Sequence, residues 1–153
     1  MKQYLAPESH IHILARALIV QDENLVLCQV KGKKWFFLPG GHVEDGEPAT
    51  AALTRELHEE LGLTDFSKPV FVGVCEHQFE DKPDVWQHEL SLVFTVTVGS
   101  DFKVDTKESH IDFVTVKKSE LPNLEVRPSP LKAGLIESLN TGTPFLKEFP
   151  VSE

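Results

Sequence analysis

The stretch that decides the fold is residues 40–63, GGHVEDGEPATAALTRELHEELGL. Residues 48–61 within it predict a helix, because an apolar stripe recurs at every fourth position, at Leu53, Leu57 and Leu61. Pro48 suits the first turn of this helix, where a missing N–H group costs nothing. Gly62 suits its C-terminal cap.

Three carboxylates lie on the same predicted helix. Glu56, Glu59 and Glu60 have i, i+3 and i+4 spacing, so we expect them on one face, with the leucines on the opposite side. Like charges at this spacing repel each other, and the helix dipole disfavours anions near the C-terminus. A hard divalent cation, Mg²⁺ or Mn²⁺, would compensate both effects. A solvated acidic helix face is the alternative interpretation of these three residues alone.

The whole stretch resembles the signature of the Nudix hydrolase family. That signature is Gly, five residues, Glu, seven residues, Arg-Glu, an apolar residue, any residue, Glu-Glu, any residue, Gly and an apolar residue. Gly41, Glu47 and residues 55–63 match it at every fixed position. The resemblance implies an α/β (α+β) fold, an α/β/α sandwich with a mixed β-sheet between helices, as a single domain over residues 1–153. It also implies hydrolysis of a diphosphate linkage in a nucleoside diphosphate attached to another group.

The resemblance further implies roles for single residues. Glu59 and Glu60 would be the main ligands of a Mg²⁺ or Mn²⁺ ion, and the backbone carbonyl of Gly40 would bind the same metal. Glu56 would be either a ligand or the base that activates water. Arg55 would orient Glu56 through a charged hydrogen bond, with an ordinary surface ion pair as the alternative.

Other acidic and glycine positions have structural or supporting roles in this interpretation. Glu47 is expected to accept helix N–H groups, to hold metal-bound water, or to stabilise the helix start against the dipole. Gly41 suits a loop with unusual backbone angles. By resemblance, a loop before a late strand supplies a further carboxylate ligand. Glu108 is the first candidate, followed by Asp112 and Asp105, and a solvated loop charge is the alternative.

Three residues are candidates for substrate contacts. Trp35 would stack on a base or ribose, with core packing as the alternative. Arg127 and His42 would contact phosphate. The alternatives are an exposed solubilising charge for Arg127 and a tolerated variable loop position for His42.

The region after the signature carries few substrate markers. The proline typical of ADP-ribose hydrolases and the tyrosine typical of dinucleoside polyphosphate hydrolases are both missing from residues 75–80, CEHQFE. We therefore expect a nucleoside triphosphate or related small nucleotide as substrate. An ADP-ribose or nucleotide-sugar pyrophosphatase is one alternative, and a nucleotide-binding module without catalysis is an alternative of a different class.

Composition narrows the class of protein. The chain has 153 residues, 41% hydrophobic and 25% charged, which predicts one globular domain. A net charge of −9 argues against a stable nucleic-acid complex or a membrane-surface role. Cys28 and Cys75 lie in apolar settings and predict reduced core thiols in a cytoplasmic protein. We expect no signal peptide and no membrane span. The pattern leaves the oligomeric state, including a homodimer, open.

The remaining elements are predicted from apolar runs and turn residues. The tail from residue 141 is expected to be loosely held. A second helix is predicted over 129–140. The predicted strands cover 11–20, 25–30, 35–38, 70–80, 88–98 and 111–116.

Overall fold

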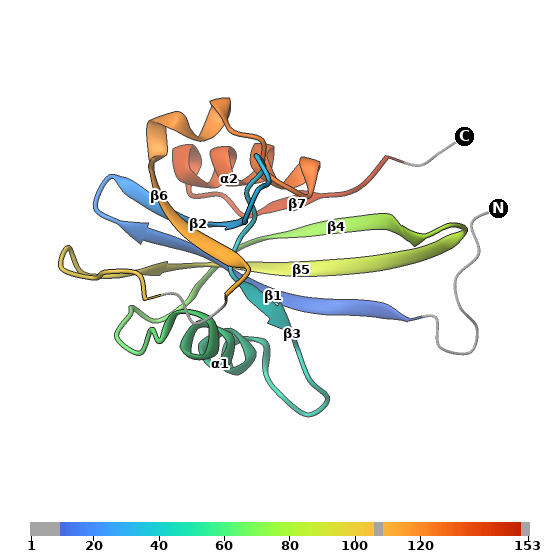
Figure 1. Ribbon diagram of the computed structural model, residues 1–153, viewed down its shortest axis with the longest axis horizontal. Helices are drawn as coiled ribbons and strands as arrows, with labels where there is room; N and C mark the ends of the chain where they lie inside the picture. The colour runs from blue at the N-terminus through green and yellow to red at the C-terminus, as the bar shows by residue number, and fades with distance from the viewer. Residues whose placement is uncertain (1–9, 106–108, 151–153) are drawn as a thin grey trace.

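The structure is a computed structural model that describes residues 10–105 and 109–150. Seven strands form one sheet, and three helical segments flank it (Figure 1). The strands are β1 (Ile11–Gln21), β2 (Asn24–Val30), β3 (Gly40–His42), β4 (Val70–Lys82), β5 (Val85–Thr97), β6 (Ile111–Lys117) and β7 (Phe145–Lys147). The helices are α1 (Ala49–Leu61), the 3₁₀ helix η1 (Lys118–Asn123) and α2 (Ser129–Thr141).

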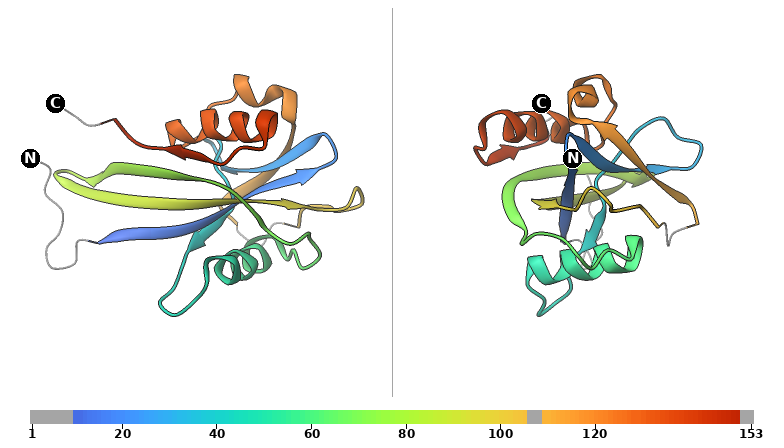
Figure 2. Two further views of the ribbon diagram at one scale, coloured as in Figure 1. Left: turned by 180° about the vertical axis from the view of Figure 1, so that it is seen from behind. Right: turned by 90° about the vertical axis from the view of Figure 1, so that its left-hand side faces the viewer.

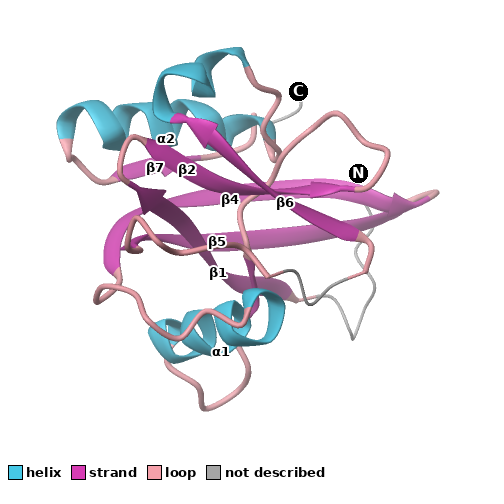
Figure 3. Ribbon diagram, turned by 60° about the vertical axis from the view of Figure 1, so that its left-hand side comes forward, coloured by secondary structure: helices cyan, strands magenta, loops and turns pink. Residues whose placement is uncertain are grey.

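The sheet is mixed. Its strand order is β6-β2-β1-β5-β4-β7, and β3 pairs with β1 beside this path. The β1–β5 and β4–β7 pairs are parallel, and the other pairs are antiparallel. Figures 2 and 3 show α1 on one face of the sheet and α2 with η1 on the other. The predicted α/β/α sandwich is therefore confirmed.

Each face of the sheet has its own apolar core. Helix α1 packs its predicted stripe of three leucines against the β1 residues Ala15, Ala17 and Ile19. Helix α2 packs Leu131 and Leu135 against the other face. Burying a leucine side chain completely contributes about 1.5–3 kcal/mol, so the stripe fixes α1 to the sheet. The position of the carboxylates on α1 follows from this attachment.

The two ends of α1 differ in how well they were predicted. Gly62 has a left-handed backbone, with φ 63° and ψ 18°, and its N–H group donates to the carbonyl of His58. The predicted C-terminal cap is thus confirmed. Pro48 lies one position earlier than predicted: it is the N-cap residue, with an extended backbone at φ −64° and ψ 147°.

Two other sequence predictions were wrong. Residues 35–38 form isolated bridges, from Phe36 to Val126 and from Phe37 to Cys28, instead of a strand. The segment from residue 141 is held as far as β7, which pairs with β4. A partner more than sixty residues away cannot be inferred from three residues of local pattern.

Phe145 explains why β7 is held. Its side chain is 6% exposed and lies between Gly73 of β4 and Gly134 of α2. A Cβ atom on either glycine would overlap the phenyl ring. Gly134, which weakens α2 as an isolated helix, is therefore required by packing.

The two cysteines are free and buried, as predicted. Burial raises the pKa of Cys75 to about 11, and burial also raises the pKa of Cys28. Both thiols are therefore protonated at pH 7. Within residues 10–105 and 109–150, no helix has the length and apolar character needed to cross a membrane.

Candidate active site

The entry to α1 depends on two glycines that allow close approach. Gly40 has φ 141°, and a Cβ atom there would overlap the carbonyl oxygen of Ala15 on β1. Gly41 faces α1, where a Cβ atom would overlap the Glu56 carboxylate. The loop therefore brings backbone atoms directly against one carboxylate of the signature.

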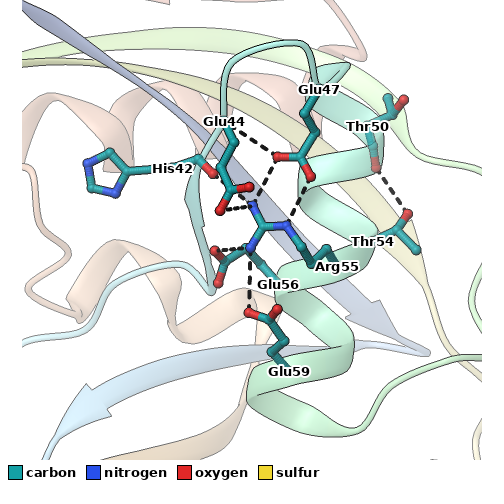
Figure 4. Close-up of polar contacts among 8 residues, drawn as sticks. All are labelled: His42, Glu44, Glu47, Thr50, Thr54, Arg55, Glu56 and Glu59. Atoms are coloured by element: carbon teal, nitrogen blue, oxygen red, sulfur yellow. Dashed lines mark hydrogen bonds and ion pairs between the residues drawn. The ribbon is translucent and has the colours of Figure 1, made fainter.

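Arg55 lies at the centre of a group of carboxylates (Figure 4). Its Nε and Nη2 donate to the two carboxylate oxygens of Glu47, at 2.9 and 3.0 Å. Its Nη1 donates to Glu56 at 3.0 Å and to Glu59 at 3.5 Å. Nη2 also donates to the carbonyl of His42 at 3.1 Å. One planar guanidinium thus fixes the loop and two acidic side chains of α1 together.

Glu47 has a different partner from the one expected. Among the described residues, no N–H group of α1 donates to Glu47, so its contacts do not include that one of the expected roles. Its carboxylate holds Arg55 and accepts the backbone N–H of Glu44 at 3.1 Å. The hydrogen bond from Arg55 is the main cause of a lowered pKa of Glu47, and the same contact raises the pKa of Arg55.

Glu60 and Glu56 form a second group, on the sheet side of α1. Glu60 is only 8% exposed and shares a hydrogen bond with Glu56. Burial, followed by this hydrogen bond and by the charge of Glu56, raises the pKa of Glu60 to about 8. The backbone N–H of Gly40 and the charge of Arg16 oppose that rise. The buried carboxyl group of Glu60 therefore touches the loop where a backbone ligand was expected.

The predicted face for the three carboxylates was only partly right. At 100° per residue, Glu60 lies about 20° from Leu53 on the helical wheel, next to the leucine stripe. Glu56 lies next to Glu60, whereas the side chain of Glu59 is 56% exposed and turns to Arg55. In the part of the chain that the structure describes, no three His, Cys, Asp or Glu side chains are arranged so that they could hold a metal.

Within the described residues, the structure does not bring the other predicted metal ligands, or the His42 side chain, to the carboxylates of α1. Glu108 lies outside the described residues. Asp112 is exposed on β6, with its Oδ1 3.9 Å from Nζ of Lys31. Asp105 lines a separate hollow beside Gly62. The His42 side chain points away from the Arg55 group in Figure 4, and its ring centroid lies 5.2 Å from that of His12.

Trp35 and Arg127 lie close together. The guanidinium carbon of Arg127 lies 4.7 Å from the centroid of the Trp35 ring. Both line a cavity of about 470 Å³ on the α2 side of the sheet. The full lining is Arg16, Val30, Trp35, Phe37, His77, Phe79, Glu89, Arg127, Pro128 and Ser129.

Arg16 connects this cavity to the carboxylates and was missed by the sequence interpretation. It lines the cavity, and its Nη1 donates to the carbonyls of Leu38 and Gly40, at 3.1 and 3.3 Å. Gly40 in turn contacts Glu60. The available signal was a single arginine within the apolar strand β1, on the same face as Leu18.

The family follows from comparison with known proteins. A profile of the NUDIX domain matches residues 11–135. The chain belongs to the Nudix family. Two curated Nudix relatives illustrate the match. An "ADP-ribose pyrophosphatase" of Methanocaldococcus jannaschii is 31% identical over 119 residues, covering 75% of this chain and 67% of the relative. A "Nucleoside triphosphatase NudI" of Klebsiella pneumoniae is 27% identical over 122 residues, covering 71% and 84%.

Solved structures share the Nudix fold. A MutT protein from Bacillus halodurans superposes with a TM-score of 0.69 at 20% identity, covering 90% of this chain and 88% of that protein. The relatives' names, pyrophosphatase and triphosphatase, describe hydrolysis of phosphoric anhydrides. With the complete signature in place, this Nudix protein is a hydrolase of that class.

Proposed function

We propose that this Nudix hydrolase cleaves the diphosphate linkage of a nucleoside triphosphate or related small nucleotide, with bound Mg²⁺ or Mn²⁺. The observation that carries the proposal is the short connection from the Glu56–Glu60 pair, through Gly40 and Arg16, to the aromatic cavity. A nucleotide has a charged tail and a flat apolar base. This arrangement offers carboxylates for the cations of the tail and aromatic rings for the base.

The residues present fit a hard divalent cation. Glu56, Glu59, Glu60 and the Gly40 carbonyl offer only oxygen ligands, which Mg²⁺ and Mn²⁺ prefer. Two of these carboxyl groups already share a hydrogen bond, with one nearly buried, so a cation bound there would take the place of the shared proton. The Gly40 carbonyl accepts one hydrogen bond from Arg16 and keeps a second lone pair. To join the pair, Glu59 would release its 3.5 Å contact to Arg55.

The bound cation would neutralise phosphate charge and lower the pKa of the attacking water. The chain's own residues prepare that site. Arg55 holds Glu56 in one orientation through a 3.0 Å hydrogen bond, which suits Glu56 to accept a proton or to act as a ligand. Arg16 adds a fixed positive charge between the carboxylates and the cavity. Transfer of a phosphoryl group needs mainly such positioning and charge stabilisation.

Trp35 and Arg127 are proposed to hold the nucleoside. The guanidinium carbon of Arg127 lies over the Trp35 ring, so the pair offers an aromatic and a cationic surface to a base. His42 turns its ring toward His12, so its proposed phosphate contact requires a rotated side chain. The two free thiols support a cytoplasmic setting, and the −9 charge supports a small-molecule substrate over nucleic acid. A homodimer is compatible with this proposal.

ADP-ribose is the second candidate substrate, favoured by the name of the Methanocaldococcus relative. The deciding experiment measures product release from a panel of nucleoside triphosphates, ADP-ribose and nucleotide sugars in ¹⁸O-labelled water, with Mg²⁺ and with EDTA. We expect Mg²⁺-dependent turnover, fastest for a triphosphate. Turnover that persists in EDTA would contradict the metal site. Tight binding with intact ligand recovered would indicate a binding module instead.

A further inference from the structure

One carboxylate inside the aromatic cavity has no role in the site described so far. Glu89 of β5 is half-buried and lines the cavity together with Trp35, Phe37 and Phe79. It pairs across the sheet with His77 of β4, so the two side chains are on the same face. A charged group in an aromatic cavity is costly unless a ligand or neighbour pairs with it.

The hydrogen bonds of the side chains around Glu89 go to other acceptors. Among the residues that the structure describes, none donates a hydrogen bond to Glu89. Arg16 directs its Nη1 to two backbone carbonyls, at 3.1 and 3.3 Å, and Arg127 donates to Glu125 at 2.9 Å. Burial lowers the pKa of His77 despite the nearby Glu89, so its imidazole is neutral at pH 7. The carboxylate is therefore free to accept hydrogen bonds from a ligand.

The aromatic rings around Glu89 define the shape of that ligand. His77 and Phe79 are stacked, with centroids 5.3 Å apart and planes inclined by 19°. Trp35 lies tilted against Phe37 at 5.9 Å. Flat faces with one carboxylate among them suit a planar heterocycle that carries N–H donors on one edge.

We infer that Glu89 selects the base, and that it favours guanine-type bases; this inference rests on the proposed nucleotide hydrolase function. An ionised carboxylate only accepts hydrogen bonds, through two parallel oxygens. Guanine offers two adjacent donors, N1–H and the N2 amino group. Adenine and cytosine offer one amino group beside an acceptor nitrogen, which would face the second oxygen unfavourably. Uracil and thymine place their single N–H between two carbonyls. The same contact that attracts guanine thus disfavours the other bases.

The test compares GTP with ITP, which differs only by lacking the N2 amino group. For the wild-type chain we expect kcat/KM for GTP to exceed that for ITP and for ATP by about tenfold or more, because the missing donor leaves a carboxylate oxygen unpaired. In Glu89→Gln and Glu89→Ala, the GTP-to-ITP ratio of kcat/KM should fall to about one, because the loss falls on GTP. Glu120→Gln, an exposed residue on η1, is the matched control and should keep the preference.

Binding separates this inference from the proposed function. Quenching of tryptophan fluorescence by GDP and by IDP reports on the cavity without any turnover, because Trp35 lies in its wall. Preferential GDP binding that Glu89→Gln abolishes would support the inference even if no nucleotide is hydrolysed. Equal affinity for GDP and IDP in the wild type would overturn it. A Glu89→Ala effect on the ratio of GTP to dGTP, with the GTP-to-ITP ratio unchanged, would assign Glu89 to the ribose and also overturn it.

Discussion

The carboxylate site and the aromatic cavity are built in opposite ways. The carboxylates and the loop that contacts them come from one contiguous stretch, residues 40–63. The cavity takes its lining from β1, β4, β5 and the segments around residues 35 and 127. Helix periodicity and one local motif therefore describe the first region, whereas only the strand order brings the second together. Under the proposed function, the residues for the chemistry come from one local segment, whereas the residues that contact the substrate are brought together by the strand order.

The largest expected effect comes from the buried carboxyl group of the first region. Glu60→Gln keeps the shape of the side chain but removes the negative charge proposed to bind metal. We expect kcat to fall by at least about a hundredfold, or roughly 2.7 kcal/mol of barrier. Steady-state kinetics at saturating Mg²⁺ measure this. Glu120→Gln should keep wild-type kcat, and a Glu60→Gln enzyme that does the same would remove Glu60 from the site.

A stability effect is expected where the loop of the first region meets the sheet. Gly40→Ala places a Cβ atom against the Ala15 carbonyl at a backbone angle that L residues rarely adopt. We expect the free energy of unfolding to fall by about 2 kcal/mol. Urea denaturation of Gly32→Ala supplies the comparison, because Gly32 also has a positive φ but has open space around it. That variant should lose only about 1 kcal/mol. Equal losses would show that the contact with β1 adds nothing.

Substitution of Arg55 tests whether the fixed orientation of the Glu56 side chain matters for catalysis. Lysine keeps the positive charge but cannot bind several acceptors through a planar fork. We expect Arg55→Lys to lower kcat by about tenfold with little change in KM, because Glu56 loses its fixed orientation. A variant with wild-type kcat would show that the contacts of Arg55 are ordinary surface ion pairs with no role in catalysis.

The smallest effect is expected in the cavity. Trp35→Ala removes the ring on which a base is proposed to stack, so KM for a nucleoside triphosphate should rise by about fivefold, with kcat nearly unchanged. Trp86→Ala is the control: Trp86 is three positions from Glu89 on β5 and does not line the cavity. If both variants change KM alike, the cavity is not the nucleoside site.

These two regions also explain what the sequence could predict. The α1 stripe, the Gly62 cap and the sandwich followed from local spacing and from the signature. The burial of Glu60 follows from its place beside the leucine stripe on the helical wheel. The contact of Arg16 with the Gly40 carbonyl depends on the pairing of β1 with β3, which the local sequence does not indicate.

The C-terminal segment and residues 35–38 also depend on contacts that are distant in the sequence. Phe145 is held by two glycines, one on β4 and one on α2, and no local pattern connects them. Residues 35–38 look like a strand because they are aromatic, but they make only single bridges, to Cys28 of β2 and to Val126. In both segments, partners far away in the sequence decide the conformation, and local propensity does not.

The central claim is that Glu56, Glu59 and Glu60 bind divalent metal. A crystal of the protein soaked in MnCl₂, measured at the manganese absorption edge, tests this claim most directly. We expect an anomalous peak bonded to carboxylate oxygens of Glu56 and Glu60, with Glu59 turned away from Arg55 to join them. A map with no peak there, and with Glu59 still on Arg55, would contradict it.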